Sequence, residues 1–175
     1  ERIVQLIHAA DIVDGVVAAA GLTDPDRLAS GELVYSGALR TPVEAIVTSV
    51  PYAGSMASLS TEAFALIGDV HVWRGDLSSA DYTVPTPDGR PATREYAGER
   101  LARVICADRE MLDHPGVSAI ADAVARAQVD SIAHAIRRVT ACHPSLRTCV
   151  VTGLGAFIGE RAARTAGLDV VHLEH

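Results

Sequence analysis

The order of the predicted secondary-structure elements indicates an α/β domain. A hairpin signal occupies residues 12–17, and apolar residues at helical spacing mark two long helices later in the chain. The C-terminal part then reads as strand, tight turn, helix and strand. Hairpin strands followed by helices and by such a strand–helix–strand segment are typical of α/β domains.

The first elements are expected to be two short antiparallel strands and a short helix. Ile12-Val13 and Val16-Val17 flank Asp14-Gly15, a pair that tolerates the positive φ angles of a hairpin turn. A helix from Asp24 to Ala29 follows, with Asp24 as its cap and Pro25 at its first position. Residues 43–50 read as a strand and residues 51–54 as a turn.

The middle of the chain is expected to alternate between helices and an irregular segment. A helix begins at residue 60 or 61 and ends near residue 67, and residues 70–73 read as a short strand or a helix end. Residues 75–93 are rich in Pro, Gly, Ser and Asp, so they are expected to form a lid or an exposed flap. Helices follow over residues 94–112 and 117–142, separated by Pro115 and Gly116 and ended by Pro144.

The last elements are a strand at residues 147–151, a turn at 152–155, a helix at 157–165 and a strand at 169–171. Residues 1–172 are expected to form a single α/β domain, because a chain of 175 residues can bury one sizeable core. Residues 173–175 read Leu-Glu-His, resemble the start of an expression tag and are left out of the fold prediction.

Composition argues against several classes of partner. The formal net charge is −7 and no basic stripe is present, so a nucleic-acid partner is not expected. No apolar run is long enough to cross a membrane and no secretory signal is visible, so a cytoplasmic protein without a membrane partner is expected. The lone Trp73 argues against an aromatic stacking platform.

The spacing of cysteines and histidines does not indicate a metal site. Cys106, Cys142 and Cys149 lack CxxC spacing and are expected to be reduced thiols in the core. The histidines show neither HxH nor HExxH spacing, which zinc sites commonly use.

A glycine-rich turn after the predicted strand at residues 147–151 is one candidate binding site. Gly153, Leu154 and Gly155 lie between that strand and a helix, where a ligand can approach the backbone and a helix N-terminus favours negative or polar groups. A dinucleotide-binding fingerprint is rejected, because too little chain follows for the required acidic residue. A tight turn without a ligand remains the alternative.

A polar loop at residues 31–42 is a second candidate. Its two glycines and its proline let the backbone turn beside the polar side chains of Glu32, Tyr35, Arg40 and Thr41. Arg40 could bind a phosphate or carboxylate with two parallel hydrogen bonds, and Glu32 could bind Mg²⁺ through water or act as a base. A loop without a function could have the same composition.

Further charged residues lie along the rest of the chain, namely Glu62, Asp69, Arg100, Arg103 and Asp108. For each of them taken singly, a structural ion pair is favoured over a catalytic role. Arg100 and Arg103 lie about one helical turn apart, so they are expected to pair with Asp108 or Glu99.

Several ordered motifs resemble those of a hydantoinase/oxoprolinase-related family. The loop Gly31-Glu32-Leu33-Val34-Tyr35-Ser36-Gly37-Ala38-Leu39-Arg40-Thr41-Pro42 is similar to the signature GELVYTG-x-x-RTP. Similar motifs elsewhere are Asp24-Pro25-Asp26-Arg27-Leu28, Glu62-Ala63-Phe64-Ala65 with Asp69-Val70, Arg100-Leu101-Ala102-Arg103 with Asp108, and Val150-Val151-Thr152-Gly153-Leu154-Gly155. Such proteins are linked to tetrahydromethanopterin-dependent one-carbon transfer and to ATP-dependent methanofuran biosynthesis.

The resemblance implies the second half of an actin-like ATPase (ribonuclease H-like) fold, with a mixed sheet and flanking helices. It implies ATP and Mg²⁺ as cofactors, with Gly153, Leu154 and Gly155 at the nucleotide. It makes Asp11, Glu32 and Arg40 the catalytic candidates, and Tyr35, Thr41 and Glu62 the candidates for binding a small-molecule substrate. A missing N-terminal half, or a second copy of the chain, would complete the cleft.

The chain departs from the family's phosphate loop, D-x-G-S-T-T-T-D. If Asp11 closes that loop, its leading Asp falls on Val4, its Gly on Leu6 and its hydroxyl residues on residues 7–10. Neither Ala9 nor Ala10 can donate a hydrogen bond from its side chain. Three functions are therefore open: an ATP-dependent synthase, kinase-like or hydantoinase-like enzyme of C1-cofactor metabolism; a non-catalytic binding or assembly subunit; and an ATP-dependent cyclic-amide hydrolase.

Overall fold

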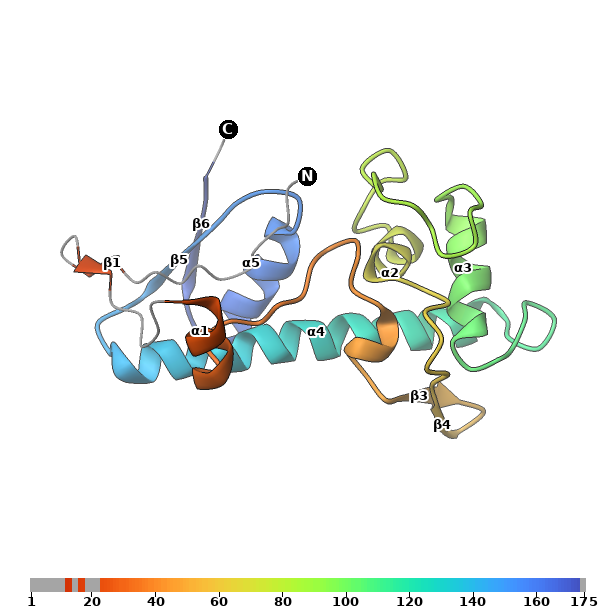
Figure 1. The fold of residues 1–175 in the computed structure, drawn as a ribbon, viewed down its shortest axis with the longest axis horizontal. Helices are drawn as coiled ribbons and strands as arrows, with labels where there is room; N and C mark the ends of the chain where they lie inside the picture. The colour runs from red at the N-terminus through yellow and green to blue at the C-terminus, as the bar shows by residue number, and fades with distance from the viewer. Residues whose placement is uncertain (1–11, 14–15, 18–22, 174–175) are drawn as a thin grey trace. The chain divides into compact units, whose positions relative to one another are not determined.

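The computed structural model describes residues 12–13, 16–17 and 23–173 of the chain. Two compact units are present, and Figure 1 shows their elements. Unit 1 comprises Glu1–Gly37 and Val129–His175, and unit 2 comprises Ala38–Gln128. Helix α4 (His114–Cys142) begins in unit 2 and ends in unit 1. The described residues thus confirm an α/β chain, whereas the single domain stays a prediction.

The described part of unit 1 contains the N-terminal hairpin, a short helix, the end of α4 and a β–α–β segment. Strands β1 (Ile12–Val13) and β2 (Val16–Val17) pair antiparallel, which confirms the predicted hairpin. Its turn at Asp14-Gly15 lies outside the described residues. Strands β5 (Thr148–Val151) and β6 (Asp169–His172) pair in parallel with Thr148 opposite Asp169, and α5 (Ala156–Thr165) connects and contacts both.

Helix α1 comprises Asp24–Ser30. Its first helical residue is Asp24, one residue before Pro25, which the sequence predicts at that position. Its cap is Thr23, whose hydroxyl accepts a hydrogen bond from the Asp26 amide, while the Asp26 carboxylate accepts one from the Thr23 amide. The prediction of Asp24 as the cap is therefore wrong, because this reciprocal pair satisfies two amides at once. Gly31 ends the helix with a φ of 73°, a left-handed conformation that glycine adopts without strain.

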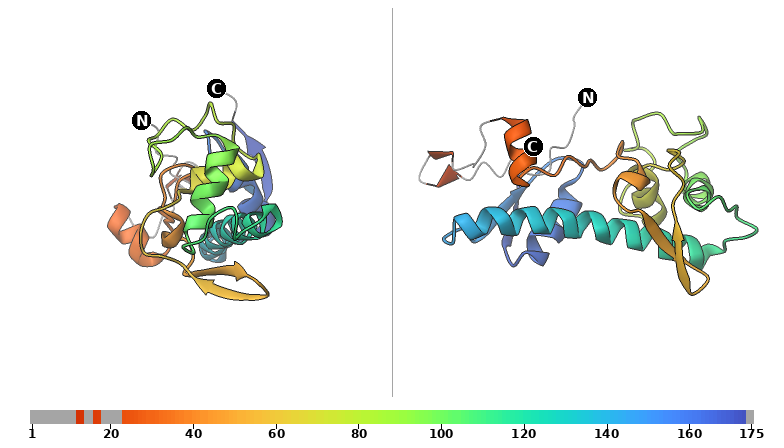
Figure 2. Two further views of the ribbon diagram at one scale, coloured as in Figure 1. Left: turned by 90° about the vertical axis from the view of Figure 1, so that its right-hand side faces the viewer. Right: turned by 60° about the horizontal axis from the view of Figure 1, so that its bottom comes forward.

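Unit 2 contains a second hairpin and three helical segments. Strands β3 (Ser49–Tyr52) and β4 (Ser55–Ser58) pair antiparallel with Ser49 opposite Ser58. Figure 2 shows this hairpin projecting beyond helices α2 (Ile67–Arg74) and α3 (Arg94–Arg103). In the described residues the strands form three separate two-stranded sheets, two antiparallel and one parallel, rather than the expected mixed sheet.

Two predictions for the first half of unit 2 are wrong. The expected strand at residues 43–50 is a 3₁₀ turn (Val43–Ala45) followed by β3, and the expected helix ending near residue 67 is extended chain. That extended chain pairs with residues 41–43: the Val43 amide donates to the Ala65 carbonyl, and the Ile67 amide donates to the Thr41 carbonyl. Long-range backbone pairing thus overrides the local helical pattern, and α2 begins where that pairing ends.

The two later helices also differ from their predicted limits. Helix α3 ends at Arg103 rather than near residue 112, and Cys106 has a φ of 58° in the turn that follows. Helix α4 begins at His114, so Pro115 and Gly116 lie in its first turn, where a missing proline amide is tolerated. The Asp113 carboxylate accepts a hydrogen bond from the Gly116 amide and so caps this turn.

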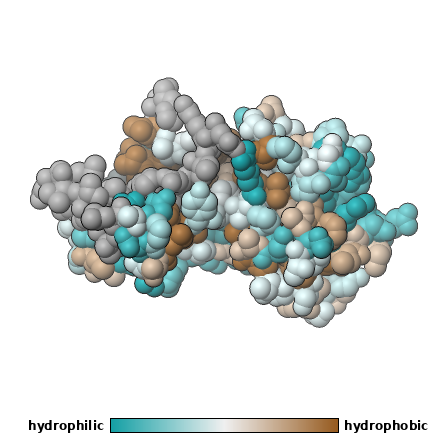
Figure 3. All heavy atoms as spheres, in the orientation of Figure 1, coloured by the Kyte–Doolittle hydropathy of each residue, from teal (hydrophilic) through white to brown (hydrophobic). Residues whose placement is uncertain are grey.

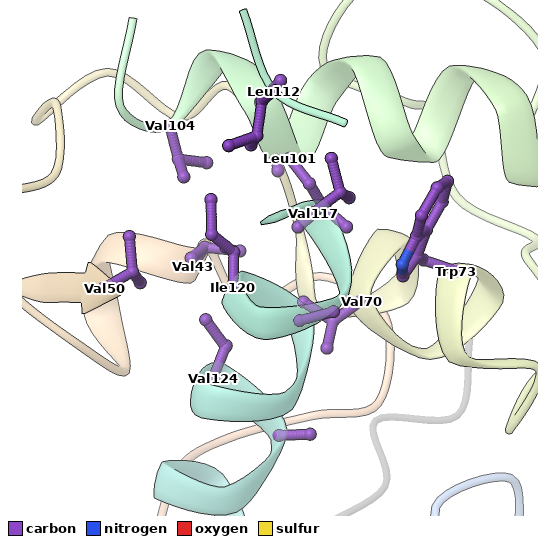
Figure 4. Close-up of a cluster of buried hydrophobic side chains, with 14 of the residues drawn as sticks. Val43, Val50, Val70, Trp73, Leu101, Val104, Leu112, Val117, Ile120 and Val124 are labelled. Atoms are coloured by element: carbon purple, nitrogen blue, oxygen red, sulfur yellow. The ribbon is translucent and has the colours of Figure 1, made fainter. Parts of the chain in front are cut away.

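A continuous hydrophobic core holds unit 2 together. Side chains from the 3₁₀ turn, β3, α2, α3 and the first part of α4 meet in it, and Val43, Val70, Leu101, Ile120 and Val124 are fully buried (Figure 4). Full burial of an aliphatic side chain of this size contributes about 1.5–3 kcal/mol. The polar groups described below are therefore fixed by a packed interior. The cysteines do not join it: Cys106 and Cys142 are exposed and Cys149 is half-buried, so the expectation of core thiols is wrong.

Candidate functional site

The glycine turn between β5 and α5 has the strand–turn–helix geometry that the sequence predicts. Gly153 is exposed with a φ of 76°, and its carbonyl accepts a hydrogen bond from the Ala156 amide at 3.1 Å. The Gly155 carbonyl accepts hydrogen bonds from the amides of Ile158 and Gly159, which starts α5. Gly153, half-buried Leu154 and buried Gly155 are consecutive in this turn.

The N-terminus of α5 is not neutralised by its own sequence. Its N-cap is Gly155, which supplies no side-chain hydrogen bond, and its first turn carries no acidic residue. Because the backbone dipoles place partial positive charge at a helix N-terminus, this end can attract a negative or polar group. Gly153 has no side chain to hinder the approach of such a group, and its left-handed conformation would strain any other residue.

The predicted residues of the polar loop fall into both units. In unit 1, Glu32 is half-buried and Tyr35 is 60% exposed. In unit 2, Arg40 and Glu62 are exposed and Thr41 is half-buried, where its carbonyl accepts the first amide of α2. Asp11 lies outside the described residues. The catalytic and substrate-binding roles of these residues stay predictions.

Two of the further charged residues, Asp69 and Arg100, form a buried ion-pair network in unit 2 together with Asp88. The side chains of Arg100 and Asp69 are both 0% exposed, and Arg100 donates to Asp69 Oδ1 from Nε at 2.9 Å and contacts it through Nη2 at 2.7 Å. Its Nη1 donates to Asp88 Oδ1 at 3.0 Å. Ion pairing is thus the role that the structure gives Arg100, but Asp69 and Asp88 replace the expected partners. Asp108 instead accepts two backbone amides in the turn after α3.

Burial and charge shift the pKa values in this network. Burial raises the pKa of the Asp69 carboxyl, although hydrogen bonds from Arg100 and the Leu66 amide oppose that effect. Burial, and then the negative charge of Asp69, raise the pKa of the Tyr82 hydroxyl far above its ordinary range. Burial alone would raise the pKa of Asp88 as well, but hydrogen bonds from Arg90 and the charge of Arg100 lower it.

The network anchors the long irregular segment. Residues 75–93 form neither helix nor strand, as predicted. Leu77 and Tyr82 are each 7% exposed, and Asp88 joins the segment to Arg100. An added Cβ at Gly68 would lie 2.5 Å from the Tyr82 ring, so the ring packs directly on α2. Hydrophilic side chains cover this segment and α3 on the face seen in Figure 3.

Two further clusters of side chains in unit 2, one around His71 and one around Trp73, were not predicted. His71 is 1% exposed, and its two ring nitrogens lie 3.3 Å from Asp76 Oδ2 and 3.2 Å from Gln128 Oε1. Trp73 lies at an open pocket with residues from α3 and α4. Sequence spacing could not reveal either group, because Gln128 is 57 residues from His71 and Ser118 is 45 residues from Trp73, so only packing brings them together.

The part of the chain that the structure describes contains no group of three or more His, Cys, Asp or Glu side chains that could hold a metal ion. None of its helices is long and apolar enough to cross a membrane.

Comparison with known proteins decides the family. The sequence model of the family described as hydantoinase/oxoprolinase matches residues 4–175. The chain belongs to the hydantoinase/oxoprolinase family. Two curated relatives carry the same name, (4-{4-[2-(gamma-L-glutamylamino)ethyl]phenoxymethyl}furan-2-yl)methanamine synthase.

The relative from Methanococcus vannielii is 33% identical over 147 residues, which are 84% of this chain and 65% of the relative. The relative from Methanocaldococcus jannaschii is 35% identical over 136 residues, which are 78% of this chain and 41% of the relative. The chain thus spans about two thirds of one and two fifths of the other. The family resemblance of the ordered motifs is confirmed.

Proposed function

We propose that this hydantoinase/oxoprolinase chain is part of an enzyme of methanofuran-type C1-cofactor biosynthesis. The observation that carries the proposal is the match of the family to residues 4–175, together with two relatives named for the same synthase. The name describes a product with a phenoxymethyl ether, a furan ring, an aminomethyl group and a γ-glutamyl group. Substrates of that class, with aromatic rings and a carboxylate, are the ones we propose for this chain.

The polar loop offers groups that suit such a substrate. Arg40 is exposed, and a guanidinium can bind a carboxylate or a phosphate with two parallel hydrogen bonds. The ring of Tyr35 is 60% exposed and could contact an aromatic ring. In our proposal Thr41 and Glu62 add polar contacts, and Glu32 accepts the proton of a phenol as the phenol oxygen displaces a phosphate group from the methylene carbon of a furan substrate. The ether C–O bond then forms as the C–O bond to phosphate breaks.

We further propose an actin-like fold in the full-length enzyme and an adenine nucleotide at the glycine turn. The open N-terminus of α5, the exposed Gly153 and the absence of an acidic first turn fit a nucleotide. Gly153, Leu154 and Gly155 would lie against it, and Asp11 would face Mg²⁺ or phosphate. When bound, Mg·ATP would supply the phosphate group that serves as the leaving group when the ether forms. The protein's own groups would hold and orient the substrate.

The nucleotide site can be tested by calorimetric titration with Mg·ATP, with Mg·ADP as a second ligand. We expect Gly153→Ala to weaken binding about tenfold or more, because a methyl group would enter the space in which the ligand meets the backbone. Gly167→Ala is the matched control: Gly167 is also left-handed, with a φ of 86°, but it lies after the other end of α5. Both variants carry a similar backbone strain.

Equal loss of affinity in the two glycine variants would refute the assignment of the turn. No binding of either nucleotide by the unmodified chain would refute the nucleotide site and favour the second candidate, a non-catalytic binding or assembly subunit. The sequence observation behind that candidate is the loss of hydroxyl residues at positions 7–10.

A further inference from the structure

An open pocket in unit 2 is lined by none of the residues used above for substrate or nucleotide. It has a volume of about 200 Å³. Its lining comes from the end of α2, the start of α3 and the first turns of α4, and consists of Trp73, Arg74, Arg94, Ser118 and Asp122.

Trp73 is held rigidly at this pocket. Its side chain is 5% exposed, and its Nε1 donates a hydrogen bond to Ser118 Oγ at 3.1 Å. Figure 4 shows its ring beside the core cluster of unit 2. The ring of His114 lies 4.7 Å from it between centroids. The indole is therefore a fixed surface rather than a mobile side chain.

Two guanidinium groups pack on this indole. The Cζ atom of Arg94 lies 4.9 Å from the ring centroid, and that of Arg109 lies 5.3 Å from it. Arg94 donates from Nε to the Trp73 carbonyl at 2.9 Å, and its Nη2 lies 3.2 Å from His114 Nε2. Arg109 donates to the carbonyls of Leu112 and Asp113.

The charge of these two arginines is not balanced locally. Among the described residues, neither Arg94 nor Arg109 has a carboxylate within ion-pair distance, whereas Arg74 pairs with both Asp76 and Asp122. A planar guanidinium that is already fixed on an aromatic ring loses little further freedom when it binds an anion. The Arg94 side of the pocket therefore combines a preorganised donor with unbalanced positive charge.

We propose that this pocket binds the oxyanion group of a small molecule, a phosphate or a carboxylate, between the Arg94 guanidinium and the Ser118 hydroxyl and against the Trp73 ring. The hydroxyl accepts from the indole, and its own proton, for which His114 Nδ1 at 3.5 Å is the neighbouring acceptor, can turn toward the ligand. Ser118 lies near the start of α4, one turn after the Asp113 carboxylate that caps this helix. The inference does not depend on the proposed nucleotide site, which lies in unit 1.

The single tryptophan of the sequence makes this pocket directly observable. Tryptophan fluorescence is titrated with inorganic phosphate, with acetate and, at matched ionic strength, with chloride. We expect a saturable change with phosphate or acetate at concentrations on the order of millimolar, and none with chloride. A response to phosphate alone assigns phosphate-bearing ligands, and one to acetate alone assigns carboxylates. No saturable response to either would overturn the proposal.

Substitutions then test which residues bind the oxyanion that changes the fluorescence. Arg94→Gln should weaken binding about tenfold or more, and Arg94→Lys, which keeps the charge without the planar fork, should weaken it less. Arg126→Gln is the matched control, because Arg126 is exposed on α4 in the same unit. Should Arg94→Gln fail to fold, Ser118→Ala gives the same test through the hydroxyl. Unchanged affinity in the folded Arg94 or Ser118 variants would overturn the proposal.

The Gly153→Ala chain separates this pocket from the nucleotide proposal. If both proposals hold, that variant binds Mg·ATP more weakly in the calorimetric titration and keeps its fluorescence response to the oxyanion. Loss of the fluorescence response in Gly153→Ala, with Arg94→Gln unaffected, would contradict the pocket assigned here.

Discussion

Arg100→Met gives the sharpest test of whether the buried charges of unit 2 stabilise the fold. Methionine fills a similar volume but leaves Asp69, which is 0% exposed, without the two contacts that it receives from Arg100. Asp88 keeps Arg90 as a partner, at 2.8 Å. The cost of the substitution therefore falls mainly on Asp69.

The size of the destabilisation depends on whether the Asp69 carboxylate stays charged in the variant or takes up a proton. Breaking a buried ion pair from one side costs about 3–5 kcal/mol, because a charge is left buried without compensation. Protonation of Asp69 limits the cost: bringing a carboxyl with an ordinary pKa of about 4 to its neutral form at pH 7 costs roughly 4 kcal/mol. We expect Arg100→Met to lower the free energy of unfolding by about 3–5 kcal/mol at pH 7.

The pH dependence of the variant has a definite sign. Its folded state holds a proton on Asp69 that the unfolded chain releases above pH of about 4, so its stability falls as pH rises. Lowering the pH from 7 to 5 should therefore recover about 1.4 kcal/mol per unit in Arg100→Met relative to the unmodified chain.

Urea denaturation at several pH values measures both effects. Arg103→Met is the matched control, because Arg103 lies on the same helix and is exposed. A loss below about 1 kcal/mol in Arg100→Met, or a loss as large in Arg103→Met, would refute the reasoning. A destabilisation that does not change with pH would show that Asp69 is not the group left unpaired.

Three further predictions concern packing, pH and capping. Gly98→Ala should lower the free energy of unfolding by about 1–2 kcal/mol, since its methyl would collide with the benzo ring of Trp73 and overpacking outweighs the gain of about 1 kcal/mol in helix propensity. Because the pKa of Asp88 is lowered in the folded state, its stabilisation is present above pH of about 4 and is lost as pH falls through the folded pKa, so Asp88→Asn should flatten the acid limb of a urea stability profile. Thr23→Ala should speed hydrogen exchange in α1 by removing about 1 kcal/mol of local stability, with little change in global stability, because α1 buries no residue.

Each of these has a control within the chain. Trp73→Phe removes the benzo ring and should reduce the cost of Gly98→Ala; an undiminished cost would exclude that collision. An acid limb in Asp88→Asn as steep as in the unmodified chain would show that another group causes it. Asp24→Ala removes the cap that the sequence predicts, and faster exchange in α1 than Thr23→Ala produces would contradict the observed cap.

Local chemistry explains the elements that the sequence predicted well. The hairpin at β1–β2, the strand–turn–helix at β5–α5 and the end of α4 before Pro144 depend on neighbouring residues, which sequence spacing displays directly. The glycine turn was predicted for the same reason, because Gly153 supplies a left-handed conformation between a strand and a helix. The wrong boundaries depend on partners far along the chain. Residues 60–67 have a helical pattern, but residues 65–67 pair with residues 41–43. Likewise, Arg100 has its partners at Asp69 and Asp88 rather than one helical turn away.

By itself the sequence determined the α/β class, the absence of long apolar spans, the glycine turn and, through ordered motifs, the hydantoinase/oxoprolinase family. Those properties depend on residue type and short spacing. Only the tertiary structure decided that Asp69 and Arg100 are a buried pair, that residues 75–93 are anchored by Tyr82 and Asp88, and that Trp73 meets Arg94 and Ser118 at a pocket. The physical reason is that these charges and rings become buried only when segments distant in sequence pack together. The same packing decides which polar groups become partners.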